Sequence, residues 1–105
     1  MLEREYQVHV DPDADEKMLG YINFLGQVSV SAAERLFYKL SDGIKSLDFN
    51  PDGYPRYPAR KKIIQMLRYC LCDKQRYRLI FDVIDDTVHV HDVQDCRQHP
   101  NKSLV

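Results

Sequence analysis

The sequence predicts one α+β domain in which a hairpin of two helices packs on one face of a small, mostly antiparallel sheet. Two observations lead to this fold class. A segment with strand periodicity is followed by two stretches with helical periodicity, and the second half of the chain holds three strand-like segments separated by turn residues. The predicted order is therefore β-α-α-β-β-β. With 105 residues the chain suffices for one modest core, so residues 1–105 are expected to form a single domain.

The first strand is predicted over residues 5–10, EYQVHV, because apolar and polar side chains alternate along it. Tyr6, Val8 and Val10 fall on one side of such a strand and are assigned to the core. His9 falls on the other side.

A helix is predicted over residues 13–25. The preceding segment DPDADEKM combines turn residues with acidic ones, so Asp11 or Asp13 is expected to cap the helix at its positive end. Gly26 is placed to end it. The apolar residues at helical spacing are Met18, Tyr21, Ile22 and Leu25.

A second helix is predicted from Ser31 to about Leu47. Ser31 and Glu34 match a capping box, and the turn-rich segment DFNPDGYPRYP ends the helix. A connection of about five residues makes the two helices antiparallel, and their apolar faces need a sheet to cover them. The apolar stripe of the second helix comprises Leu36, Phe37, Leu40, Ile44 and Leu47.

Three strands are predicted to form a meander from about Ile63 to Val93. The first runs to about Leu71 and is followed by a turn at DKQ; its beginning is also compatible with a helix. The second is RYRLIFDVI, the tight turn is DD at 85–86, and the third is TVHVHDV.

If Asp85 and Asp86 are the two turn residues, the register of the hairpin follows. The predicted pairs are Ile84–Thr87, Asp82–His89, Ile80–His91 and Arg78–Val93. The pair Asp82–His89 is expected to be a surface ion pair rather than a catalytic pair. The core face then carries Tyr77, Leu79, Phe81, Val83, Val88 and Val90. The opposite, open face carries Arg78, Ile80, Asp82, His89, His91, Asp95 and Arg97.

Potential metal ligands occur in two places. Cys70, Cys72, Cys96 and His91 are residue types that zinc prefers, but their spacing does not match a zinc ribbon or finger. The HVH pair is two ligands short of a structural zinc site. We therefore expect three free thiols, no disulfide, no metal and no other cofactor, with a zinc site as the alternative.

The net charge of −1 conceals an asymmetry. Residues 1–53 carry ten acidic and five basic residues, whereas residues 54–105 carry six acidic and ten basic residues. Such a cationic half is able to bind a polyanion, although composition alone slightly favours a solvated sheet face as the explanation. No apolar run approaches the roughly 20 residues that span a bilayer, and the start MLEREYQVHV lacks the pattern of a signal peptide, so we expect a cytoplasmic protein.

Four segments, in order, connect the sequence to a known family. They are the first strand with VDPDADEKM, the helix SAAERLFYKLSDGIKSL with FNPDGYP, the hairpin YRLIFDVIDDTVHVHDV and the terminal DCRQHP. Together they cover nearly the whole chain and resemble toxins of the RelE/ParE superfamily, from bacterial type II toxin–antitoxin modules. The predicted order of elements agrees with the fold of that superfamily.

The resemblance implies a metal-independent mRNA endoribonuclease. RNA-cleaving members enter the ribosomal A site, where a ribose 2′-OH attacks the adjacent phosphate; this needs cations at the phosphate and groups that move protons. Arg78 matches the arginine that contacts the scissile phosphate, and Arg97 and His99 match the transition-state cation and the acid/base imidazole. Further substrate-binding cations would be Lys61, Lys62 and Arg76. Because neighbouring antiparallel strands end side by side, Arg78, Arg97 and His99 are expected to converge on one patch.

Two alternatives stay open. Pro100 stands where an aromatic residue ends the YoeB-like pattern, and ParE-like members share the helical hairpin but inhibit DNA gyrase without a nuclease site. The chain is thus a ribosome-dependent endoribonuclease, a gyrase inhibitor or a non-toxic homologue. All three imply an antitoxin protein as partner; the first adds the ribosome and mRNA, and the second adds gyrase.

Overall fold

The chain folds in the predicted β-α-α-β-β-β order. The computed structural model describes residues 6–58 and 66–97. Its elements are β1 (Gln7–Val10), α1 (Pro12–Gly26), α2 (Val30–Ser46), the short 3₁₀ helix η1 (Pro51–Gly53), β2 (Arg68–Cys72), β3 (Tyr77–Ile84) and β4 (Thr87–Asp95). The predicted beginning of the meander at residues 63–65 lies outside the described residues.

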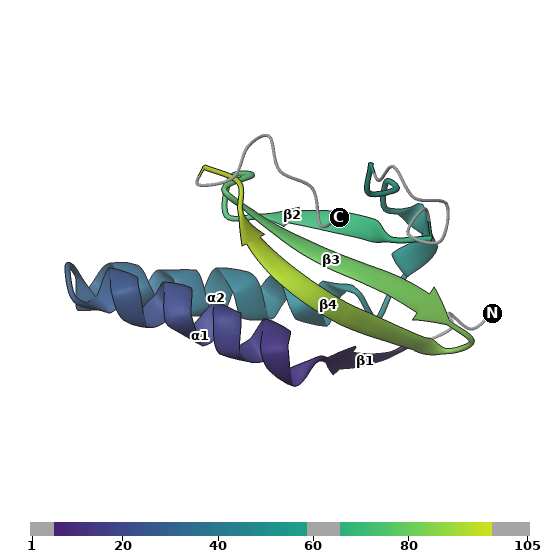
Figure 1. The fold of residues 1–105 in the computed structure, drawn as a ribbon, viewed down its shortest axis with the longest axis horizontal. Coiled ribbons are helices and arrows are strands. Elements are labelled where there is room, and N and C mark those ends of the chain that lie inside the picture. Colours follow the sequence, from purple (N-terminus) through teal and green to yellow (C-terminus); the bar gives the residue numbers. More distant parts are fainter. Residues whose placement is uncertain (1–5, 59–65, 98–105) are drawn as a thin grey trace.

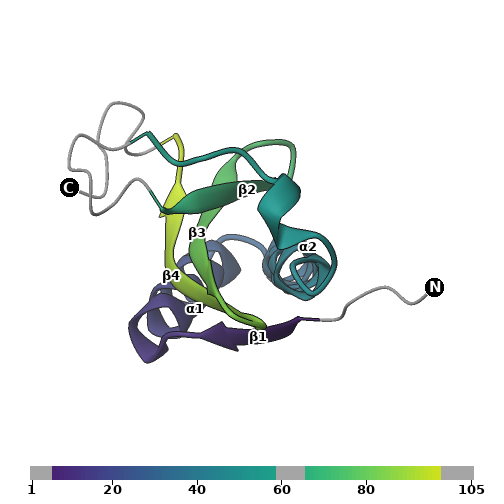
Figure 2. The same cartoon turned by 90° about the vertical axis from the view of Figure 1, so that its right-hand side faces the viewer.

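The strands form one mixed sheet in the order β1-β4-β3-β2. β1 runs parallel to β4, and the other two pairs are antiparallel. Both helices lie on one side of this sheet (Figure 1), and in the end-on view the twisted sheet curves around them (Figure 2). Within the described chain, neither helix combines the length and apolarity needed to cross a membrane.

The main core lies between the helices and the sheet. The predicted core face of β3 and β4 is confirmed, and Phe81 at its centre has no exposed surface. Burying such a side chain contributes about 1.5–3 kcal/mol. The other buried members are Ala14, Met18, Leu36, Leu40, Leu47, Cys70, Cys72, Tyr77, Leu79, Val88, Val90 and Val93. All three cysteines are free thiols.

The two predicted helix caps have different outcomes: Asp11 is the N-cap residue of α1, as one of the two predicted candidates, whereas the predicted capping box of α2 is wrong. Ser29, not Ser31, caps α2: its Oγ accepts a hydrogen bond from the backbone N–H of Ala32 at 3.2 Å. The helix therefore begins two residues earlier, and the capping box does not form. Asp11 occupies the N-cap position of α1 without a side-chain cap, because its carboxylate contacts His91 instead.

The register of β3 and β4 follows the prediction from the turn as far as Phe81. The confirmed pairs include Ile84–Thr87 and Asp82–His89. Although Asp82 faces His89 in the register, its ion-pair partner is His91, whose Nε2 lies 3.1 Å from Asp82 Oδ1. The predicted ion pair is thus replaced by a diagonal one.

A β-bulge next to Phe81 shifts the rest of the register by one residue. Ile80 pairs with Asp92 and Arg78 with Gln94, each one residue beyond the predicted partner. A bulge inserts one extra residue into one strand, which changes the face of every later side chain on that strand. This shift determines the arrangement of the candidate site.

The sequence analysis predicted that the face of the sheet opposite the helices is open. The structure shows that part of this face is covered. Ile80 is completely buried there, in a second small cluster with Tyr57, Leu67 and, at its margin, Tyr69. The backbone of residues 55–57 pairs with the chain at the start of β2, where Arg56 forms an antiparallel bridge with Arg68 and the N–H of Tyr57 donates to the carbonyl of Leu67 at 2.8 Å. This pairing places the Tyr57 side chain against Ile80, and the ring covers part of this face of the sheet.

Candidate functional site

The residues expected to act on a substrate lie in different parts of the chain. Lys61, Lys62 and His99 lie outside the described residues. Arg76 is exposed in the turn before β3, Arg78 lies near the start of β3, and Arg97 follows the end of β4.

Arg78 is held on the face of the sheet away from the helices. Its Nε and Nη2 both donate to Oε1 of Gln94, at 3.1 and 2.7 Å. The guanidinium also lies against two rings, with Cζ 5.0 Å from the centroid of Tyr57 and 5.8 Å from that of Tyr69. An arginine has five N–H donors, so this orientation leaves donors for a ligand while the cation stays fixed.

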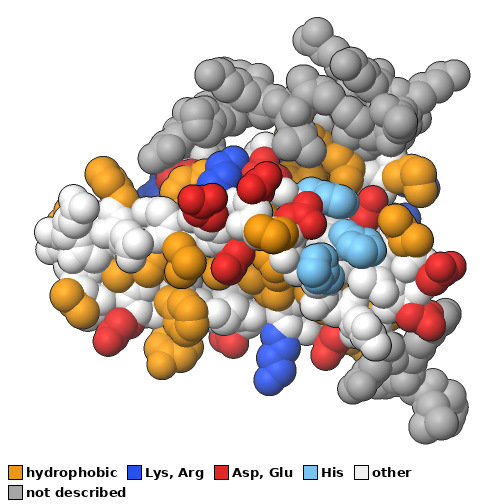
Figure 3. All heavy atoms as spheres, turned by 60° about the horizontal axis from the view of Figure 1, so that its bottom comes forward, with side chains coloured by type: hydrophobic (Ala, Val, Ile, Leu, Met, Phe, Trp, Pro, Cys, Tyr) orange, Lys and Arg blue, Asp and Glu red, His pale blue; other side chains and the backbone are white. Residues whose placement is uncertain are grey.

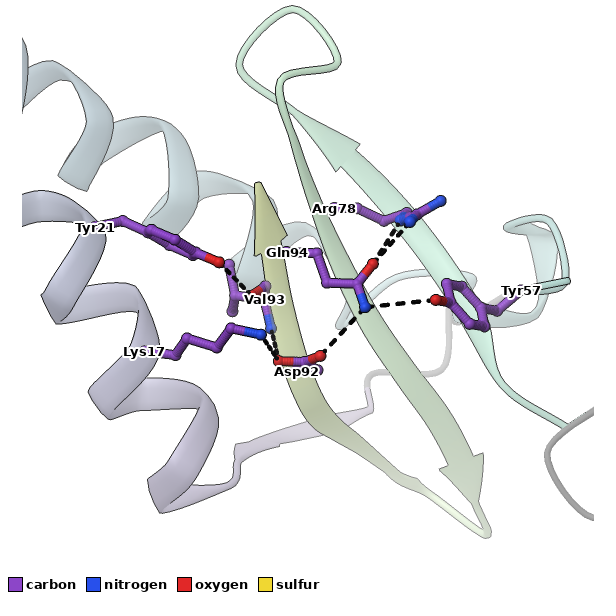
Figure 4. A network of polar contacts seen from close by, with 7 residues as sticks. All are labelled: Lys17, Tyr21, Tyr57, Arg78, Asp92, Val93 and Gln94. Atoms are coloured by element: carbon purple, nitrogen blue, oxygen red, sulfur yellow. Dashed lines mark hydrogen bonds and ion pairs between the residues drawn. The ribbon is translucent and has the colours of Figure 1, made fainter. Parts of the chain in front are cut away.

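A chain of polar contacts links this arginine to helix α1 (Figure 4). The amide Nε2 of Gln94 donates to the hydroxyl of Tyr57 and to the carboxylate of Asp92, both at 3.4 Å. Asp92 in turn forms an ion pair with Lys17 of α1 at 2.8 Å. The position of Arg78 is therefore coupled to the edge of the sheet and to α1.

Arg97 has different partners. Its Nε and Nη2 donate to the two carboxylate oxygens of Asp95, at 3.1 and 3.2 Å, and Nη2 also donates to the Tyr77 hydroxyl at 3.1 Å. Asp95 is buried, and its hydrogen bond raises the pKa of Arg97 further above its ordinary value. The pKa of Tyr77 is raised because burial disfavours its phenolate, and because Asp95 repels it. The charge of Arg97 is thus balanced within the protein.

The structure does not bring Arg78 and Arg97 to one face. Neighbouring strand residues point to opposite sides, so Tyr77 faces the helices and Arg78 faces away from them. Arg97 lies over the ring of Tyr77, with Cζ 5.4 Å from its centroid. The expectation that Asp95 and Arg97 share the face of Arg78 is wrong, because the bulge turns Asp95 toward the helix side.

A second candidate surface covers the free end of the helical hairpin. A shallow groove of about 480 Å³ runs between α1 and α2, with Ile22, Ala33, Phe37 and Tyr38 among its lining residues. Phe37, predicted in the core stripe, is 43% exposed here. Hydrophobic side chains are exposed at this end of the molecule (Figure 3). In and near the connection between the helices, and along α2, the exposed apolar residues include Phe24, Val28, Val30 and Tyr38. Contiguous apolar surface of this kind marks interaction sites.

Sequence reasoning did not find several of these residues. Gln94 was missed because only the bulge places it beside Arg78, and the alternation of the strand carries no sign of a bulge. Tyr57 and Tyr69 were missed because their approach is a long-range contact. The hairpin surface had a signal: Phe24, Val28 and Val30 are apolar but lie outside the predicted helical stripes.

Comparison with known proteins places the fold. No family model and no curated protein matches the sequence. Among solved structures, a chain described as "Chromosomal ParDE TA system from P. aeruginosa" superposes with a TM-score of 0.71, covering 88% of this chain and 97% of the other. The chain has a RelE/ParE-like fold. Because the two sequences are only 9% identical, this similarity shows a shared fold and no more. The shared fold agrees with the fold that the four sequence segments led us to expect.

Proposed function

We propose that this chain is the toxin of a type II toxin–antitoxin module and that it acts in the cytoplasm by binding a protein target, as gyrase-inhibiting ParE-like toxins do. The fold supports the first part, since the similar structure belongs to a ParDE toxin–antitoxin system. One observation carries the second part: Arg97 is neutralised by buried Asp95 on the side of the sheet opposite Arg78. Cleavage of RNA needs several uncompensated cations at one phosphate.

The proposed antitoxin has a fitting surface on this chain. The groove between α1 and α2 is largely apolar and lies at the free end of the hairpin. An amphipathic segment of a partner binds such a groove by inserting side chains at helical spacing. The exposed rings of Phe37 and Tyr38, which line this groove, are suited to anchor it, because aromatic residues dominate binding energy at interfaces.

A ribosome-dependent endoribonuclease is the second candidate function. Arg78 favours it, because Gln94 and two tyrosine rings hold its guanidinium in a defined orientation, as phosphate recognition requires. In this mechanism Arg78 contacts the scissile phosphate, His99 transfers protons, and Arg97 would have to leave Asp95. Lys61, Lys62 and Arg76 would bind the mRNA.

Induction of the wild-type gene in a bacterial host tests both candidates. Growth, mRNA cleavage by primer extension, and gyrase supercoiling with purified protein are measured, with Arg78→Ala and His99→Ala beside the exposed control Lys39→Ala. The proposal predicts growth arrest that an antitoxin from an adjacent short reading frame relieves, inhibited supercoiling and intact mRNA, with His99→Ala still toxic. Ribosome-dependent cleavage that His99→Ala abolishes would replace it with the nuclease. Absence of growth arrest would make the chain a non-toxic homologue.

A further inference from the structure

Two cysteines of strand β2 lie on the face of the sheet that packs against the helices. Cys70 and Cys72 are two residues apart on one strand, so their side chains project to the same face. Both belong to the main core, yet neither is completely covered, since Cys70 is 6% exposed and Cys72 is 7% exposed. β2 is an edge strand of the sheet. The two thiols are therefore neighbours at the margin of the core rather than at its centre.

Helix α2 leaves room for the sulfur of Cys72 and supplies a hydroxyl beside the pair. A Cβ at Gly43 would collide with Sγ of Cys72, so the sulfur occupies the space that a longer residue would fill. Three residues further along α2, the hydroxyl of Ser46 lies 3.4 Å from that of Tyr54, in an exposed contact. The thiol of Cys70 is within hydrogen-bonding reach of both hydroxyls and of the Cys72 thiol. Two thiols and two hydroxyls thus form one cluster, which we call the thiol cluster.

The thiol cluster favours the thiolate of Cys70. The hydrogen bond with the Cys72 thiol lowers the pKa of the Cys70 thiol to about 7, and the two hydroxyls act in the same direction against the effect of burial. The pKa of Cys72 is raised, because its thiol donates to Cys70 and because it is buried. The thiolate is the nucleophilic form of cysteine. Cys70 is therefore suited to attack, and Cys72 is a second thiol held next to it.

We propose that Cys70 and Cys72 form a redox-active pair that a hydroperoxide, such as hydrogen peroxide, converts into a disulfide. The Cys70 thiolate attacks one peroxide oxygen, the O–O bond breaks, and the departing oxygen takes a proton from solvent, which leaves Cys70 as a sulfenic acid. The Cys72 sulfur then attacks the sulfur of Cys70, an S–S bond forms, and the hydroxyl leaves with the Cys72 proton as water. The two thiols lose two electrons and the peroxide gains them.

The disulfide requires a small movement at the end of β2. In an extended strand, Cα atoms two residues apart are separated by about 6.4–6.8 Å, which is the upper end of the 4.4–6.8 Å that disulfides span. Cys72 is the last residue of β2, so its approach to Cys70 disturbs only the pairing with Tyr77. Strained disulfides are easily reduced, which fits a reversible pair rather than a permanent bond. The inference stands independently of the proposed function.

Peroxide treatment of the unaltered, fully reduced protein tests the pair. Hydrogen peroxide is added at pH 7, the remaining thiols are alkylated in denaturant, and tryptic peptides are measured by mass spectrometry over time. Cleavage after Arg68 and Lys74 gives one peptide, residues 69–74, that holds both cysteines, whereas Cys96 falls in another peptide. We expect peptide 69–74 to lose two hydrogen atoms and its alkylation, and dithiothreitol to restore both.

Cys96 is the internal control, because it is more exposed than either thiol of the pair. We expect the pair to be oxidised at least threefold faster than Cys96, since a larger thiolate fraction outweighs the lower nucleophilicity of each thiolate. This comparison within one molecule does not depend on how a variant folds. Faster oxidation of Cys96, or no disulfide within peptide 69–74, would overturn the proposal.

Three serine variants assign the steps. Cys72→Ser should stop at a sulfenic acid on Cys70, which dimedone labels, and Cys70→Ser should show no such label on Cys72. Cys96→Ser should form the disulfide at the rate of the wild type. Dimedone labelling of Cys72 in Cys70→Ser, with none of Cys70 in Cys72→Ser, would contradict the assignment of Cys70 as the attacking thiol.

Discussion

Arg97 and Asp95 are joined by two side-chain hydrogen bonds, and Asp95 is only 3% exposed although it carries a charge. The backbone N–H of Arg97 donates to the same carboxylate at 2.9 Å. Through the Tyr77 hydroxyl the pair also ties the end of β4 to the start of β3. Buried charges are retained in folded proteins when they are paired in this way.

Removal of this arginine should therefore reduce stability. Arg97→Ala leaves the Asp95 carboxylate with fewer donors, and we expect the free energy of unfolding to fall by about 1–2 kcal/mol, since the arginine side chain is half exposed. Urea unfolding followed by circular dichroism measures the change. Arg76→Ala removes an exposed arginine nearby and should stay within about 0.5 kcal/mol of the wild type. Equal effects of the two substitutions would contradict a structural role for Arg97.

The central phenylalanine of the core gives a test of the register. Phe81→Ala creates a cavity between sheet and helices and should cost about 3–5 kcal/mol. The control Phe24→Ala, at a position 68% exposed, should change stability by less than about 0.5 kcal/mol. If Phe81→Ala were as mild as its control in urea unfolding, the assignment of this face of β3 to the core would fail.

Two helical glycines should respond in opposite directions to alanine. A Cβ at Gly43 would meet Cys72 Sγ and lie 3.3 Å from Leu79 Cδ1, so Gly43→Ala should destabilise by about 1–2 kcal/mol. Nothing lies within 4 Å of a Cβ at Gly20, so Gly20→Ala should stabilise α1 by about 0.5–1 kcal/mol. Thermal unfolding measures both. The double variant Gly43→Ala/Cys72→Ala should lose less stability than the sum of the losses of the two single variants, because removal of the sulfur makes room for the new Cβ. A loss equal to that sum would argue against a close contact between the two positions.

The cap of α2 can be assigned by a matched pair of substitutions. Ser29→Ala removes the acceptor for the Ala32 N–H and should cost about 1 kcal/mol, whereas Ser31→Ala should cost only a few tenths. Helix content and urea midpoints provide the comparison. The reverse order of effects would favour the capping box that the sequence suggests.

The hairpin surface makes a prediction about partner binding. Tyr38→Asp should weaken binding of the proposed antitoxin at least tenfold, because Tyr38 lines the groove and a charge cannot be buried against an apolar partner. Phe49→Asp, at a position 55% exposed outside the groove, is the control and should bind normally. Surface plasmon resonance with the product of the adjacent reading frame measures both. Unchanged binding by Tyr38→Asp would show that the antitoxin uses another surface.

Periodicity alone was sufficient to predict the order of helices and strands along the chain. Side chains that repeat at helical or strand spacing must be buried together, so the stripe of Leu36 and Leu40 and the alternation through Phe81 predicted both layers before any contact was known. The tight turn at Asp85 also set the register, because pairs close to a turn follow from counting residues. These are local properties of the chain.

The candidate sites depended on contacts between residues far apart in sequence. One extra residue in β4 places Gln94, rather than Val93, beside Arg78. The same residue turns Asp95, and with it Arg97, toward the helices. The alternation of apolar and polar residues along a strand does not predict such a bulge. The parallel pairing of β1 with β4 brings His9 to His89, although 80 positions separate them. Residue types were readable from the sequence, but the face on which each one lies was decided by strand pairing, since a shift of one residue reverses the side.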